Sequence, residues 1–128
     1  MSGFTDYLED ALLKHVFTNT AYTSPTTVYA ALFTVAPSDT GGGTEVSTSG
    51  TAYARQSMAF SVSGTGTLAT NSAAVEYPTA TADYGTVVAV GIFDASTSGN
   101  LLAYASLTAN KTVDSGDVFR FNAGDVDI

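Results

Sequence analysis

Two short apolar runs separated by a turn-rich segment constrain the fold of this 128-residue chain more than any other feature. Val87–Phe93 and Leu101–Leu107 are each of strand length, and the residues between them are mainly Ser, Gly, Asn and other small polar types. Apolar runs of this length that flank such a segment are typical of two antiparallel strands joined by a short loop. The pattern predicts a β-hairpin over residues 87–107.

The rest of the chain repeats this alternation of short apolar runs and turns, with 12 Gly and three Pro lying mainly between the runs. We expect further strands at 27–35, 57–63, 66–69, 73–77 and 118–122, and a tight turn at 114–117. Seven or eight short strands at this spacing predict a mainly β fold, a two-layer antiparallel β-sandwich with one short N-terminal α-helix. We expect a single domain over residues 1–128, with helix and linker in 1–25 and the sandwich in 26–128.

Two of these strands carry a specific burial pattern. Thr27–Val35 is apolar on both alternating faces, which predicts a central strand covered on both sides. Ser57–Ser63 alternates cleanly, with Met58, Phe60 and Val62 on one face, and predicts a single half-buried strand.

The only segment with a helical pattern runs from about Thr5 to about Phe17. Leu8, Leu12 and Val16 recur every four residues, and Thr5 suits the N-cap position. We expect this apolar stripe to pack against the sandwich, because it would otherwise form a large exposed apolar patch. The alternative is that the helix is a docking arm for another protein.

The charge composition excludes several classes of partner. The net charge is −8 with only four cations, so the chain lacks the basic surface that neutralises phosphates. We therefore expect no nucleic-acid binding, and on the same grounds no binding to anionic membranes. Residues 1–16 also fail as a signal peptide, because acidic residues occupy the region that should be cationic and then apolar.

The sequence offers little chemistry for catalysis. His15 is the single histidine and there is no cysteine, so every Ser-His or Cys-His system would depend on this one residue. A glycosidase needs two facing carboxylates, and most acids here fall in expected loops. We expect no enzymatic activity, no catalytic residues and no cofactor.

The acidic residues near the C-terminal end do not predict a metal site. Asp114, Asp117, Asp125 and Asp127 gather near the C-terminal end, and carboxylates suit calcium. Ordinary turn chemistry explains aspartates at these positions equally well, so we expect them to bond turn backbone and expect no metal.

Two further features suggest a contact surface. Gly41, Gly42 and Gly43 lie in a loop between residues 36 and 44, which we expect to be mobile or ordered on assembly. Arg55 is one of few cations, and its five donors favour either an intrachain pair with a carboxylate or a contact between subunits.

Five separated segments carry a family resemblance, and they keep their order along nearly the whole chain: Tyr7–Phe17, Tyr22–Thr34, Tyr53–Gln56, Ala80–Leu107 and Gly116–Asp125. In these segments the chain resembles a family of small tailed-bacteriophage virion proteins, whose members are labelled tail-fibre or minor structural proteins. The resemblance implies a structural component of a phage particle, synthesised in the bacterial host cytoplasm, with no catalytic motif to carry over.

Within that family we expect a head decoration or cement protein that binds the capsid in many symmetric copies, because one compact domain without heptads or fibre repeats suits this role. The alternatives are a tail-fibre or tail-tip component that contacts the host surface, and a carbohydrate-binding or adhesion module. The expected partners are other virion proteins, either the major capsid protein or tail proteins, and further copies of the chain. The expected partner-binding residues are Leu8, Leu12, Arg55, Gly41, Gly42 and Gly43.

Overall fold

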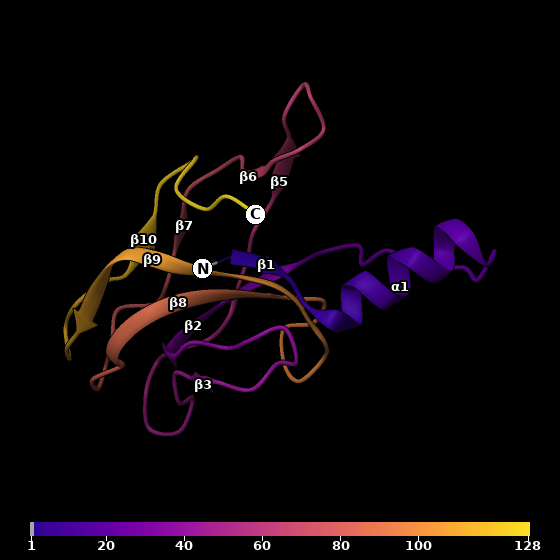
Figure 1. The fold of residues 1–128 in the computed structure, drawn as a ribbon. Helices are drawn as coiled ribbons and strands as arrows, with labels where there is room; N and C mark the ends of the chain where they lie inside the picture. The colour runs from indigo at the N-terminus through magenta and orange to yellow at the C-terminus, as the bar shows by residue number, and fades with distance from the viewer. Residues whose placement is uncertain (1) are drawn as a thin grey trace.

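The computed structural model describes residues 2–128, which form ten strands and one helix (Figure 1). In chain order these are β1 (Ser2–Phe4), α1 (Asp6–Phe17), β2 (Tyr29–Val35), β3 (Thr44–Glu45), β4 (Gln56–Ser57), β5 (Phe60–Val62), β6 (Ala69–Asn71), β7 (Val75–Glu76), β8 (Gly85–Phe93), β9 (Leu101–Val113) and β10 (Arg120–Phe121).

One six-stranded antiparallel sheet forms the larger layer, with strand order β1-β9-β8-β2-β3 and β4 paired to the start of β2. Its centre is the β8–β9 hairpin, in which Phe93 pairs with Leu101, so the hairpin expected over residues 87–107 is confirmed. Strand β2 lies between β8 on one side and β3 and β4 on the other, which confirms that it is central. Its residues alternate between two buried clusters on opposite faces of the sheet.

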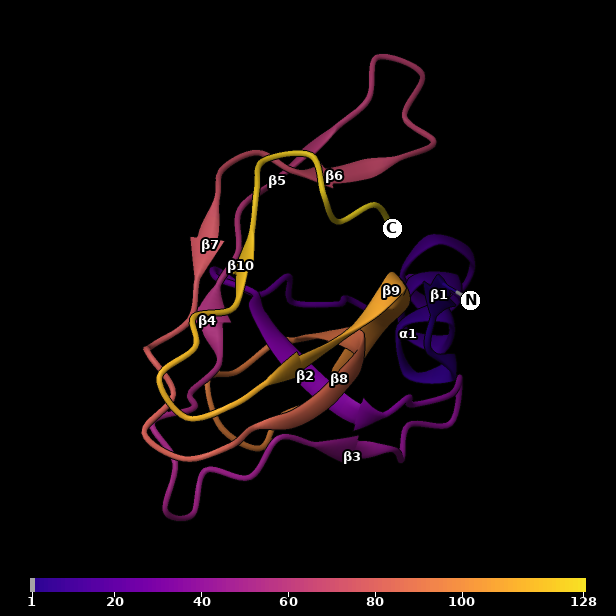
Figure 2. The same cartoon turned by 90° about the vertical axis from the view of Figure 1, so that its left-hand side faces the viewer.

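Two small antiparallel pairs, β7–β10 and β5–β6, provide the second layer (Figure 2). The main hydrophobic core fills the space between the layers and includes residues from both, among them Leu32 and Val90 from the large sheet and Val75 and Phe121 from the small one. The expected mainly β fold, a β-sandwich with one short helix, is therefore confirmed.

Aromatic rings dominate this core. Tyr77 is 1 % exposed, stacks on Tyr53 with ring centroids 6.1 Å apart, and meets Phe119 and Phe121 edge to face. Its hydroxyl donates a 2.8 Å hydrogen bond to the Ala30 carbonyl, which fastens the small layer to β2. Rings of this size remove more apolar surface from water than any other side chains, so a few of them can stabilise a small sandwich.

The buried tyrosines predict an alkaline limit to stability. Burial raises the pKa of both Tyr53 and Tyr77 well above the ordinary value of 10.0, because a phenolate in the core would lose its hydration. Above pH 10 the unfolded chain releases these protons and the folded chain retains them, so the free energy of unfolding falls as the pH rises. We expect urea midpoints to decline from about pH 10 upward, more steeply than in a Tyr77→Phe variant. Equal slopes in the two proteins would refute this assignment.

The helix departs from the sequence expectation in its packing. Its bounds agree, with Thr5 as N-cap, but none of its residues is buried, and α1 projects away from the sandwich (Figure 1). The expected burial of the stripe against the sandwich is wrong. Periodicity identifies which face of a helix is apolar but not what covers that face, and here Leu8 in the first turn lines a groove with residues of the sandwich while no residue of the helix is buried.

The strand expected over Ser57–Ser63 is also wrong as a single element. The chain leaves the large sheet after β4 and enters the small layer at β5, with Met58 turned into the core between them. Val62, expected on the buried face, is 66 % exposed because β5 and β6 extend beyond the core as a hairpin. When a chain passes from one sheet to the other, its apolar and polar residues still alternate along the sequence. The face that packs against the core changes.

Candidate partner-binding surfaces

The start of α1 is fixed firmly to the large sheet. The Thr5 backbone N–H donates to the Leu102 carbonyl at 2.9 Å, and the Thr5 hydroxyl donates to the Leu101 carbonyl at 2.6 Å. The same hydroxyl oxygen accepts from the N–H of Leu8 as the helix cap. Thr5 is 2 % exposed, so the direction in which α1 leaves the sandwich is set by buried hydrogen bonds.

The chain returns along the helix after α1 ends. The N–H of Thr18 bonds the Lys14 carbonyl, and the N–H of Tyr22 donates to His15 Nδ1 at 3.1 Å. His15 thus ties the returning segment to the helix. We call residues 6–25 the N-terminal arm, and it extends beyond the body of the sandwich (Figure 1).

The far end of the arm exposes a cluster of large apolar side chains. Leu13 is 58 % exposed, Val16 67 % and Phe17 78 %, whereas Leu8 and Leu12 are half-buried. We call Leu13, Val16 and Phe17 the arm tip. Clusters of exposed apolar side chains on a small protein mark contact sites for other molecules.

An apolar groove lies at the base of the arm. Its volume is about 260 Å³, and all eight residues that line it are apolar: Leu8, Val28, Phe60, Ala69, Ile92, Leu102, Ala103 and Ile128. A second depression of about 430 Å³, which shares Val28 and Phe60 with the first, continues along β4 and the linker at Pro25. The open edge of the sandwich is therefore hollowed and apolar next to α1.

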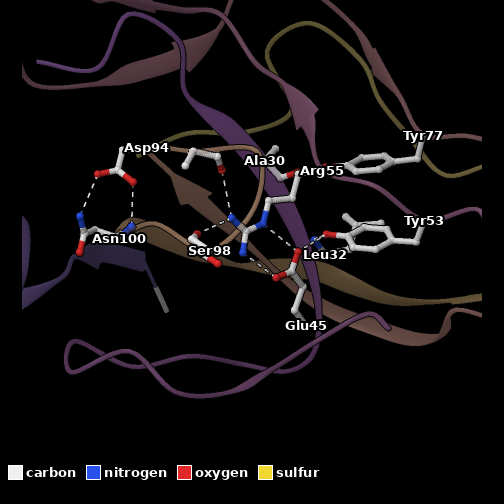
Figure 3. A network of polar contacts seen from close by, with 10 residues as sticks. Ala30, Leu32, Glu45, Tyr53, Arg55, Tyr77, Asp94, Ser98 and Asn100 are labelled. Atoms are coloured by element: carbon white, nitrogen blue, oxygen red, sulfur yellow. Dashed lines mark hydrogen bonds and ion pairs between the residues drawn. The ribbon is translucent and has the colours of Figure 1, made fainter. Parts of the chain in front are cut away.

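Arg55 is committed within the chain. Its guanidinium makes two bonds to the Glu45 carboxylate, from Nε at 2.9 Å and from Nη2 at 2.8 Å, and its side chain is 8 % exposed (Figure 3). It also lies over the Phe93 ring, 3.6 Å from the centroid. The intrachain pair expected for Arg55 is confirmed, and a role of Arg55 at a partner surface stays a prediction.

The same guanidinium organises the loop between β8 and β9. Nη1 of Arg55 donates to the carbonyls of Ala95 at 3.0 Å and Ser98 at 2.8 Å. At the other end of the loop, Asp94 accepts hydrogen bonds from both the backbone and the side-chain amide of Asn100 (Figure 3). Arg55 therefore acts as a bracket that joins β3 to this loop.

The glycine loop is held down by hydrogen bonds. The Asp39 carbonyl accepts from the N–H of Asp6, and the Asp39 carboxylate accepts from the hydroxyl of Tyr104, a hydrogen bond that raises the pKa of that tyrosine. At Gly43, φ is +73° and a Cβ would lie 2.6 Å from the Val35 carbonyl oxygen, so this position requires glycine. The expectation that this loop is mobile or ordered on assembly stays a prediction.

Two of the residues expected at a partner surface, Gly41 and Arg55, lie around one loop. A depression of about 240 Å³ is lined by the start of α1, by Asp39–Gly41 and by Gly99–Leu101, and Arg55 bonds the Ala95 carbonyl of the same 94–100 loop. Leu8 faces the apolar groove instead. Sequence reasoning missed that groove and the role of Glu45, since neither has a local signal.

Two of the C-terminal aspartates accept hydrogen bonds from turn backbone, as expected. Asp117 accepts from the N–H of Asp114, and Asp125 accepts from the N–H of Asn122. Asp127 accepts from the Thr70 hydroxyl at 2.7 Å. Within residues 2–128 no three carboxylate or histidine side chains gather as a metal site would require, and no described helix has the length and hydropathy to cross a membrane.

Comparison with known families agrees with the virion resemblance. The family model described as Podophage GP4 fiber I protein gp80 matches residues 3–128, which is nearly the whole chain. No curated protein matches the sequence. Because the matched residues span both the arm and the sandwich, the chain belongs to the Podophage GP4 fiber I protein gp80 family, a family of tailed-phage structural fibre proteins.

Proposed function

We propose that this protein is a fibre subunit of a tailed-phage particle, acting by binding and not by catalysis, and that the N-terminal arm is its assembly element. The observation that carries the proposal is the arm tip, where Leu13, Val16 and Phe17 stand in solvent on a helix that buried hydrogen bonds hold away from the sandwich. A free protein gains nothing from such a cluster, whereas an assembly buries it. The family description, which names a fibre protein, supports the same role.

In this proposal the expected partner-binding residues have different structural roles. Leu8 and Leu12 form the inner part of the arm, and Gly41 and Gly42 leave open space where a neighbouring chain can approach the backbone. Gly43 shapes the glycine loop, and Arg55 contributes through the 94–100 loop, which it positions. The partners are other virion proteins, and with a net charge of −8 we expect neither nucleic acid nor an anionic membrane among them.

A head decoration protein is the second candidate, since the chain forms one compact sandwich and the described residues contain no extended shaft. Such a protein stabilises a shell by bridging its subunits, in hundreds of copies. The copy number separates the two roles. We expect quantitative mass spectrometry of purified particles to find at most tens of copies, in keeping with the low rotational symmetry of a tail. Hundreds of copies per particle would instead establish the head role.

A carbohydrate-binding role for the exposed loops stays a prediction. Synthesis in the host cytoplasm before assembly is likewise part of the proposal, and the acidic surface would keep free copies dispersed until they meet their partner.

A further inference from the structure

The arm tip of one copy cannot reach the apolar groove of the same copy. Leu8 lines the groove at the base of α1, and Phe17 ends the helix. At 1.5 Å per residue Phe17 lies about 14 Å further along the helix axis than Leu8. The hydrogen bonds of Thr5 hold the helix in this direction, so the tip points away from its own groove.

The two features match each other in chemistry. The tip offers a leucine, a valine and a phenylalanine, and the groove is lined by apolar side chains alone, with about 260 Å³ of space. A phenylalanine side chain gains most from a site of this kind, where no polar group loses water on binding.

A lysine borders the tip and an aspartate borders the groove. Lys14 lies on the helix between the tip residues, where it is 56 % exposed and paired only with Asp10, which is itself 63 % exposed. At the groove, Asp127 precedes Ile128 and bonds Thr70, the neighbour of Ala69. A tip that enters the groove can bring Lys14 toward Asp127, which offsets part of the long-range repulsion between acidic copies.

We infer that the occupant of the apolar groove is the arm tip of a second copy of this chain. The contact is head to tail: each copy inserts its tip into the next copy and receives a tip in its own groove. Contacts of this type close into a ring or continue as a filament, depending on the rotation between copies. The inference rests on the proposed function, because it names the partner of the arm as the same chain.

The test is the self-association of the purified protein, measured by sedimentation over a concentration series. We expect Phe17→Asp in the tip and Ala69→Asp in the groove each to weaken association by at least about tenfold, because each places a carboxylate in the apolar contact. Val35→Asp is the matched control, since Val35 is 56 % exposed on β2 outside both surfaces. It should associate like the unmodified protein, and circular dichroism should show that all three variants fold.

Mixing the two variants makes the test specific. The Ala69→Asp protein keeps an intact tip and the Phe17→Asp protein keeps an intact groove, so together they should form a species of twice the monomer mass that grows no further. Groove variants that associate normally, or an unmodified protein that stays at its monomer mass of 13.1 kDa at high concentration, would overturn the inference.

Two outcomes distinguish a failure of the head-to-tail contact from a failure of the proposed fibre role. A monomeric protein that is still present in purified particles would overturn the head-to-tail contact and leave the fibre role standing. A protein that self-associates as described but is missing from particles would retain the contact and refute the fibre role.

Discussion

Replacing Tyr77 by alanine should lower the free energy of unfolding by about 3 to 5 kcal/mol, because it empties a buried site in the core. Tyr77 is 1 % exposed at the centre of the aromatic cluster, so the substitution leaves a cavity between the two layers and removes its bond to the Ala30 carbonyl. The melting temperature should fall by roughly 10 to 20 °C. Denaturant titration and calorimetry measure both quantities.

Tyr77→Phe separates the ring from the hydroxyl. This variant keeps the contacts with Tyr53, Phe119 and Phe121 and removes only the hydrogen bond, so it should cost about 1 to 3 kcal/mol, the cost of a buried carbonyl left without its donor. If both variants lost the same stability, the hydrogen bond and not the packed ring would be the main contribution of Tyr77.

Arg55→Glu should destabilise the free protein by about 3 to 5 kcal/mol, because it removes the partner of a poorly exposed carboxylate and puts a second negative charge beside it. The side chain of Glu45 is 24 % exposed and also accepts a bond from the Tyr53 hydroxyl, so it cannot move freely into water. The 94–100 loop would lose both of its bonds to the guanidinium at the same time. Thermal unfolding of the isolated protein measures the effect.

Arg120→Glu is the matched control for this charge reversal. Arg120 pairs with Glu76 at 3.5 Å, with side chains 51 % and 59 % exposed, and exposed pairs of this kind contribute at most about 1 kcal/mol. The two reversals should therefore differ clearly in melting temperature. An Arg55→Glu protein as stable as the Arg120→Glu protein would show that the bracket around Arg55 does little for the fold.

A different substitution at Arg55 tests its part in assembly. If Arg55 only positions the 94–100 loop, a protein carrying Arg55→Lys, which keeps the charge, should enter particles in proportion to its remaining stability. A fully stable variant that fails to incorporate would return Arg55 to the partner surface.

The sequence alone determined the features that depend on neighbours in the chain. The β8–β9 hairpin follows from two apolar runs around a turn segment, and the start of α1 follows from the capping preference of Thr5. The Asp114–Asp117 turn and the family resemblance were readable in the same way. Hydrogen bonds that close over a few residues leave a local pattern, so these elements could be predicted.

Only the tertiary structure decided which apolar surfaces are covered. The stripe on α1 predicted a helix, yet the hydrogen bonds from Thr5 to Leu101 and Leu102, nearly a hundred residues away, direct the arm out into solvent. The groove draws its lining from positions as distant as Leu8 and Ile128. Burial depends on packing between segments far apart in the chain, and such packing leaves no period or motif in the sequence.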